Sequence, residues 1–256
     1  PICENKEAKQ IPNKSKNKIN IRFWIGLKLL YENFSGLLCT EIYWHSNDLY
    51  FIQDNFFSSI ENLLHKDYIF FNVSLVNLDI NHANIIIIDN NLQTIERFDP
   101  FGVMDYNDID KLDVLLEIKL NKVISKEKKI KYKYLRPKDY LRINSFQSLS
   151  QHENIENQNT GDVSGFCLAW CFWYLENRLN NPGVKQKLLV SKLEKKLIND
   201  KTKIVEYIRS YANKLNLEKV KLLKEFKISP KEYYKVFPGI KELIDLYKLI
   251  YNKIKS

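Results

Sequence analysis

The pattern of apolar and polar positions predicts a β-hairpin in the middle of the chain. Four consecutive isoleucines, Ile85–Ile88, lead to a polar turn at Asn90-Asn91, and a second apolar strand then runs to Asp99. Asparagine tolerates the positive φ angles that tight hairpin turns need. Counting outward from a two-residue Asn-Asn loop places His82 directly opposite Asp99, at the open end of the hairpin.

The same pattern predicts further helices and strands along the chain. Apolar residues recur at three- and four-residue spacing in five segments, which indicates amphipathic helices. These segments are 22–37, 54–65, 109–122, 184–215 and 217–251. Runs rich in aromatic and β-branched residues predict strands at 68–76, 130–135 and 139–146.

A long apolar run, GFCLAWCFWYL, predicts a buried helix that carries a cysteine in its first turn. Ser164 can cap this helix, and Cys167 then lies among backbone N–H groups that have no partner within the helix. These groups and the helix dipole favour a thiolate, and they can also hold an oxyanion. The sequence thus supplies a candidate nucleophile, Cys167, a candidate base, His82, and a candidate orienting carboxylate, Asp99.

These elements predict an α+β fold with a central mixed sheet, a buried Cys-bearing helix and extra C-terminal helices. We expect three regions along the chain. Residues 1–19 form a polar, basic and disordered arm, residues 20–182 form the catalytic domain, and residues 183–256 form a lysine-rich helical extension packed on the same domain.

The ordered histidine, aspartate and cysteine resemble the SUMO- and ubiquitin-like-protein-specific cysteine proteases and their adenovirus-proteinase relatives. In that family a histidine opens a hydrophobic strand, an aspartate ends the next strand, and a glutamine precedes a cysteine that starts a helix. The resemblance covers Tyr68 to Leu179. The chain departs from the pattern at Ala83, where the family usually has Trp, and at Leu168, where a glycine usually follows the cysteine.

This resemblance implies a papain-like or adenain-like fold and a thiol peptidase or isopeptidase. Cys167 would attack the carbonyl, His82 would take and return the proton, and Asp99 would orient the imidazole. The implied partner is a protein substrate, either ubiquitin, a ubiquitin-like modifier or a viral polyprotein. No cofactor and no metal is implied.

The resemblance also implies a glutamine that stabilises the oxyanion. The candidates are Gln147, Gln151 and Gln158, and Gln147 is favoured because it follows the predicted strand 139–146. The segment Arg178–Pro182 further resembles uncharacterised proteases of large DNA viruses, which suggests a viral source.

Other interpretations of the same residues stay open. Asp99 also begins an ordinary turn sequence, Asp-Pro-Phe-Gly, and cysteine is among the most buried residue types. His152, Asp89 and Glu96 are rivals for the base and the orienting carboxylate. Two alternative functions remain: an acyltransferase that uses the same triad, and an inactive scaffold that binds protein or nucleic acid through a basic surface.

The formal net charge of +9 permits a nucleic-acid partner. Lysine dominates this charge, especially in Lys119–Lys133, and the chain is also rich in Asn and Ile, as an AT-rich genome produces. A basic face of this kind is typically solvated, and it can equally steer an acidic protein toward the chain. We therefore favour a protein partner over nucleic acid.

The remaining features of the composition argue against several classes of protein. Four cysteines without regular spacing argue against a disulfide scaffold and a zinc site. No apolar run approaches the ~20 residues of a membrane helix. There is no signal-peptide pattern, and Pro1 in place of Met suggests a fragment. We expect a reduced setting, intracellular in the host cytoplasm or within a virion.

Overall fold

The computed structural model describes residues 41–46, 49–52, 56–76, 81–103, 108–148, 166–199 and 204–225. The chain divides into two compact units. One unit is Cys39–Tyr211, and the other combines Pro1–Leu38 with Ala212–Ser256. The expected arm at 1–19, the helix at 22–37 and most of the helix at 217–251 lie outside the described residues.

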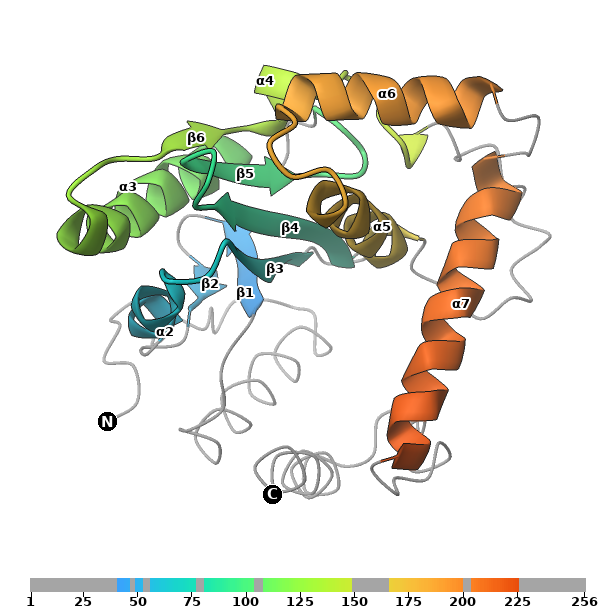
Figure 1. The fold of residues 1–256 in the computed structure, drawn as a ribbon, viewed down its shortest axis with the longest axis horizontal. Coiled ribbons are helices and arrows are strands. Elements are labelled where there is room, and N and C mark those ends of the chain that lie inside the picture. The colour runs from blue at the N-terminus through green and yellow to red at the C-terminus, as the bar shows by residue number, and fades with distance from the viewer. Residues whose placement is uncertain are drawn as a thin grey trace, which may run out of the picture. The chain divides into compact units, whose positions relative to one another are not determined.

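A six-stranded mixed sheet forms the centre of the unit Cys39–Tyr211. Its strands are β1 (Glu41–Ser46), β2 (Leu49–Phe51), β3 (Tyr68–Val76), β4 (Asn81–Asp89), β5 (Thr94–Phe98) and β6 (Lys133–Leu135). Their order across the sheet is β2-β1-β3-β4-β5-β6 (Figure 1). The pairs β1–β3 and β5–β6 are parallel, and the other neighbours are antiparallel.

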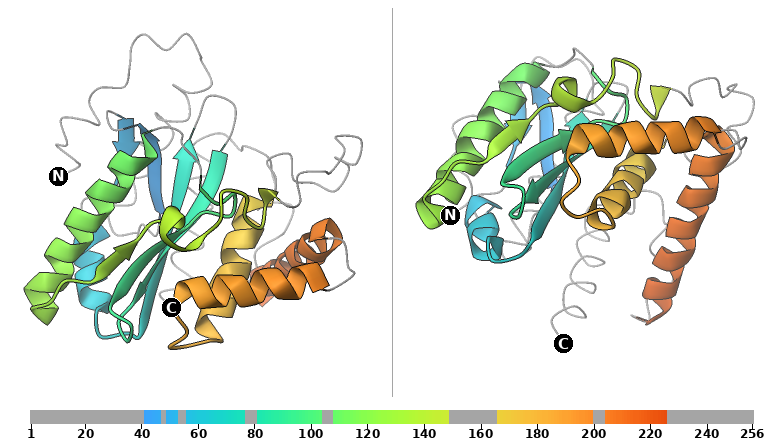
Figure 2. Two further views of the ribbon diagram at one scale, coloured as in Figure 1. Left: turned by 90° about the horizontal axis from the view of Figure 1, so that it is seen from above. Right: turned by 45° about the horizontal axis from the view of Figure 1, so that its top comes forward.

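The described helices are α2 (Phe56–Leu63), α3 (Ile109–Lys128), α4 (Pro137–Tyr140), α5 (Cys167–Leu179), α6 (Gln186–Asn199) and α7 (Ile204–Glu225). Helices α2 and α3 lie on one face of the sheet, and α5 lies on the other (Figures 1 and 2). None of these helices is long and apolar enough to cross a membrane.

The two covered faces explain the run of four isoleucines in β4. Ile86 and Ile88 join the hydrophobic core on the side of α3, whose inner face contributes Leu112 and Leu116. The alternate residues point to the opposite face, where the neighbouring Phe98 stacks on a tyrosine of α5. A strand that is buried on both faces reads as a continuous apolar run.

Several predicted elements are confirmed. The strand at 68–76 is β3, the helix at 54–65 contains α2, and the strand at 130–135 contains β6. The helix predicted at 109–122 extends to Lys128 as α3, and the helix at 184–215 divides into α6 and the start of α7. The fold is a mixed α/β fold with a mixed sheet, whereas the finer papain-like or adenain-like arrangement stays a prediction.

The strand predicted at 139–146 is wrong. Pro137 starts the short helix α4, and the backbone N–H of Arg136 donates to the carboxylate of Asp139 at 2.7 Å. Proline is favoured at the first position of a helix, and the carboxylate fixes that turn. Residues 141–148 then follow as irregular backbone.

Candidate functional site

The hairpin has a longer loop than predicted. Ile85 pairs with Phe98 and Asp89 pairs with Thr94, so four residues rather than two connect the strands. The expected direct opposition of His82 and Asp99 is therefore wrong. Extending the ladder places Asp99 two residues away from the position opposite His82. Because a shift of two residues keeps every side chain on its face, the two side chains still meet as diagonal neighbours.

His82 and Asp99 form a buried pair at the open end of the hairpin. Nε2 of His82 and Oδ1 of Asp99 are 2.8 Å apart, and both residues are buried. The same Oδ1 accepts the backbone N–H of Phe101 at 2.9 Å, and Gly102 N–H donates to the Asp99 carbonyl at 3.0 Å. Asp99 therefore begins the turn that its sequence suggested and also orients the imidazole.

Helix α5 brings Cys167 to the same place. The helix begins at Cys167 itself, after Phe166 as N-cap, with no side-chain capping bond. The predicted cap, Ser164, lies outside the described residues. Cys167 is 5% exposed, and its thiol lies within hydrogen-bonding reach of the His82 ring. The structure thus brings together the three residues that the sequence singled out.

Burial and charge act in opposite directions on this cluster. Burial lowers the pKa of His82, but the hydrogen bonds to Asp99 and Cys167 and the charges of both groups outweigh it and raise this pKa to about 9. Burial raises the pKa of Asp99, but His82, Arg97 and the Phe101 N–H together lower it below its usual value. The imidazole is therefore cationic near neutral pH, and the carboxylate is ionised.

One face of α5 follows the hairpin along its length. Cys167, Cys171, Tyr174 and Arg178 recur at three- and four-residue spacing. The Cys171 thiol donates to the Ala83 carbonyl at 3.3 Å. The Tyr174 ring stacks on Phe98 with centroids 3.9 Å apart, and Arg178 reaches the turn end of the hairpin.

Arg178 connects the C-terminal end of α5 to the hairpin. Its guanidinium donates to Asp89 at 2.7 Å and to Glu96 at 2.9 Å, and all three side chains are fully buried. Burial raises the pKa of Glu96 to about 7, against the lowering effect of Arg178. Asp89 and Glu96, the rival carboxylates, therefore bind Arg178 and lie apart from His82 along the strands. The spacing of Arg178 from Cys167 is the signal that sequence analysis could have used.

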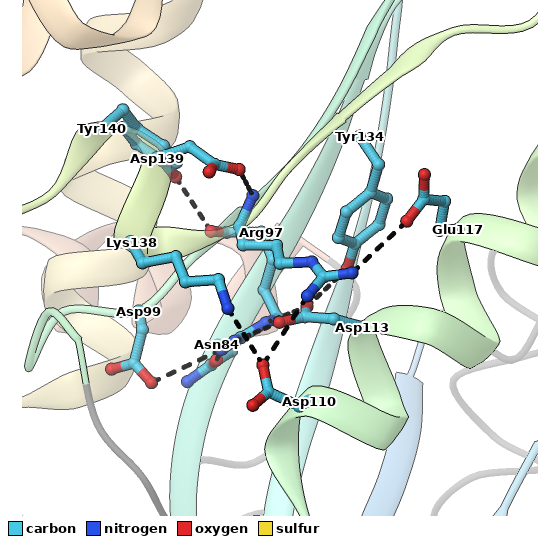
Figure 3. Close-up of polar contacts among 11 residues, drawn as sticks. Asn84, Arg97, Asp99, Asp110, Asp113, Glu117, Tyr134, Lys138, Asp139 and Tyr140 are labelled. Carbon is cyan, nitrogen blue, oxygen red and sulfur yellow. Dashed lines mark hydrogen bonds and ion pairs between the residues drawn. The ribbon is translucent and has the colours of Figure 1, made fainter.

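A second buried arginine, Arg97 on β5, connects the candidate site with α3 (Figure 3). Its Nη1 lies 3.7 Å from Oδ2 of Asp99 and donates to Asn84 at 2.6 Å. Its Nε and Nη2 donate to the two oxygens of Asp113 on α3, at 2.7 and 2.9 Å. Tyr134 adds a hydrogen bond to the Asp113 carboxylate at 2.8 Å. This network was not predicted from the sequence, because its residues come from β4, β5, α3 and β6 and are distant along the chain.

The backbone of Gln147 is hydrogen-bonded to the turn that follows Asp99. Its N–H donates to the carbonyl of Pro100 at 2.9 Å, directly after Asp99, and the residue is buried. Gly102 allows residues 142–145 to approach this turn closely. Its φ is +100°, and a Cβ there would lie 2.3 Å from the Arg142 carbonyl oxygen. The oxyanion role of the Gln147 side chain stays a prediction, and Gln151 and Gln158 lie outside the described residues.

The other two described histidines lie in different parts of the fold. His65 follows α2, and its Nδ1 contacts the Asn62 carbonyl at 2.9 Å. His45 lies in β1, and His152 lies outside the described residues. Among the residues that the structure describes, no group of three or more His, Cys, Asp or Glu is arranged to hold a metal ion.

The arrangement can support chemistry at sulfur. A cationic imidazole beside a thiol stabilises negative charge on sulfur, and the start of a helix acts in the same direction. The buried aspartate keeps the imidazole oriented and cationic. These features place the Cys167 thiol beside an imidazole that a buried carboxylate orients.

Comparison with known proteins gives a different functional indication. No family model matches the chain. The chain is similar to a protein of Acanthamoeba polyphaga mimivirus that is provisionally named an ankyrin repeat protein, with 38% identity over 160 residues. The match covers 58% of this chain and 20% of the mimivirus protein. The chain therefore spans about a fifth of the length of that relative.

This comparison overturns the expected family and activity. The relative carries the name of a repeat protein and not of a SUMO- or ubiquitin-like-protein-specific protease, so the interpretation as a thiol peptidase or isopeptidase is wrong. The prediction that the chain is an enzyme is therefore wrong as well. The relative agrees better with the alternative of an inactive scaffold, and its viral source agrees with the viral character suggested by the sequence.

Proposed function

We propose that this chain is a protein-binding module of a larger viral protein. The support from comparison is the mimivirus relative, because ankyrin repeats stack into solenoids whose extended surfaces bind other molecules. The described part of this chain forms a sheet flanked by helices. We therefore transfer the binding role of ankyrin repeats to this chain, but not their repeat architecture.

The observation that carries the proposal is an exposed apolar residue on each of two segments that adjoin the buried His82, Asp99 and Cys167. Asp99 holds the buried His82 at 2.8 Å, and Phe101 packs against its ring with centroids 4.7 Å apart. Leu168 follows Cys167 in the first turn of α5 and is exposed, and Ile143 is exposed in the segment that is hydrogen-bonded to the Phe101 turn. Interfaces combine apolar anchors with a few oriented polar groups in this way.

We place the centre of this binding site at His82, Asp99 and Cys167, with Gln147 at its border. The partner is a protein segment whose apolar side chains cover Leu168 and Ile143. The Cys167 thiol lies at the start of the same helix as Leu168. A reduced intracellular or virion setting suits such a thiol.

Site-specific photocrosslinking tests this proposal. Photoreactive benzoylphenylalanine is placed at Leu168, or at Leu188 of α6 as a matched exposed control, and the full chain is irradiated in nuclease-treated extracts of infected cells. We expect a discrete protein adduct from position 168 alone. An excess of unlabelled parent chain should compete with it, whereas the Leu168→Asp chain should not. Equal adducts from both positions, or equal competition by Leu168→Asp, would contradict the proposal.

A further inference from the structure

The outward face of α3 carries an exposed apolar pair among charged side chains. Val114 and Ile118 lie one turn apart and are 45% and 61% exposed. The same spacing continues to Asp110 before them and to Lys122 after them, and Lys111 lies three residues before Val114; all three are exposed. The inward face packs into the core through Leu112, Leu116, Leu120 and Ile124. The apolar pair is therefore additional to the face that α3 needs for folding.

At the solvent-accessible positions of α3, lysines outnumber the carboxylates, which are Asp110, Glu117 and Glu127. Lys119, Lys122 and Lys128 form no ion pair with any described residue, whereas Glu117 on the flank of the helix pairs with Arg136. Further exposed lysines follow at positions 126, 129, 131 and 133. A surface of this kind attracts a negatively charged partner and leaves two aliphatic side chains for it to bury.

We propose that the outward face of α3 is a docking surface for an acidic, amphipathic segment of a partner protein. Its apolar residues would cover Val114 and Ile118, and its carboxylates would face the surrounding lysines. This chemistry favours a protein over nucleic acid, because phosphates make no use of exposed aliphatic side chains. It also favours a protein over a lipid surface, because membrane helices insert a broad apolar face, and that face of α3 packs against the sheet.

Fluorescence anisotropy with the full chain tests this surface separately from the site around Cys167. The probe is a labelled synthetic peptide with leucines and glutamates on one helical face, and its control is a scrambled peptide of the same composition. We expect Ile118→Asp to weaken binding of the amphipathic peptide at least about tenfold, because a buried aliphatic contact is lost. Lys122→Glu should weaken binding and reduce its dependence on salt. Leu188→Asp, at an exposed site on α6, should change nothing.

Other outcomes would overturn the proposal. Equal binding of the scrambled peptide, or binding that Ile118→Asp leaves unchanged, would leave only non-specific attraction. Tighter binding of oligothymidylate or of phosphatidylserine vesicles, unaffected by Ile118→Asp, would assign the face to nucleic acid or lipid. Circular dichroism of each variant establishes that the fold is retained, since all of the substituted side chains are exposed.

Discussion

Cys167 and Cys171 lie one helical turn apart on α5, yet their surroundings give them different chemistry. Cys171 is fully buried and donates to the Ala83 carbonyl, and burial raises its pKa well above the ordinary value. Cys167 begins the helix and contacts the cationic ring of His82. The residue type alone does not separate the two cysteines, whereas the position in the helix and the partner at the sulfur do.

We expect iodoacetamide to label Cys167 in the native protein at least about tenfold faster than Cys171, because the thiolate is the reactive form. His82→Ala should slow labelling of Cys167 by removing the cation beside the sulfur. The measurement is a quenched time course with mass spectrometry of the two cysteine-containing peptides. In urea both cysteines should react alike. Equal native rates, or an unchanged rate in His82→Ala, would argue against an activated thiol.

At the scale of elements, polar side chains connect α5 to the hairpin at both ends of the helix. His82 meets Cys167 at the open end of the hairpin, and Asp89 and Glu96 hold Arg178 at the turn end. Arg178 also donates to the Val184 carbonyl at 3.1 Å, which ties the segment that follows α5 to the same point. This double attachment determines where the first turn of α5, and therefore Cys167, lies against the sheet.

Arg178→Met should destabilise the fold by about 3–5 kcal/mol, because it leaves two carboxylates buried without their cation. The matched control is Lys111→Met, which removes an ion pair between two exposed side chains, Lys111 and Asp108, and should cost at most about 1 kcal/mol. Urea unfolding of the parent and both variants measures the two free energies. Similar losses in the two variants would mean that the buried cluster contributes no more than a surface pair.

The hairpin illustrates what the sequence predicts at this scale and where it fails. The apolar run, the polar turn and the face shared by His82 and Asp99 were predicted correctly, since they depend only on alternation along a strand. The register was wrong, because the loop runs over four residues. The carboxylate of Asp89 accepts the N–H groups of Asn91 and Leu92, both at 2.9 Å, and Gln93 has a φ of 55°. The length of this loop depends on three-dimensional contacts, which the Asn90-Asn91 sequence alone does not reveal.

At the scale of the molecule, the unit Cys39–Tyr211 has a core that reaches beyond α5. Helix α6 and the start of α7 bury five apolar side chains in it, Leu189, Val190, Leu193, Leu197 and Ile208. Gln186 also donates to the Thr94 hydroxyl at 3.0 Å, and Trp173 donates to the Tyr207 hydroxyl at 2.7 Å. Sequence periodicity predicted these helices, but only the packing identifies them as part of the core that supports the candidate site.

A fragment of residues 39–211 should therefore unfold cooperatively, whereas a fragment of residues 39–182 should not. Each of the five buried side chains contributes about 1.5–3 kcal/mol. Their sum is comparable with the whole stability of a domain, about 5–15 kcal/mol. Near-ultraviolet circular dichroism and urea unfolding measure the difference. Two neighbouring leucines of α6 provide a matched control within the longer fragment: Leu189→Asp should abolish the transition, because Leu189 is buried, and Leu188→Asp should preserve it, because Leu188 is exposed. A cooperative transition in the shorter fragment would instead place α6 and α7 outside the core and limit the binding module to the sheet, α3 and α5.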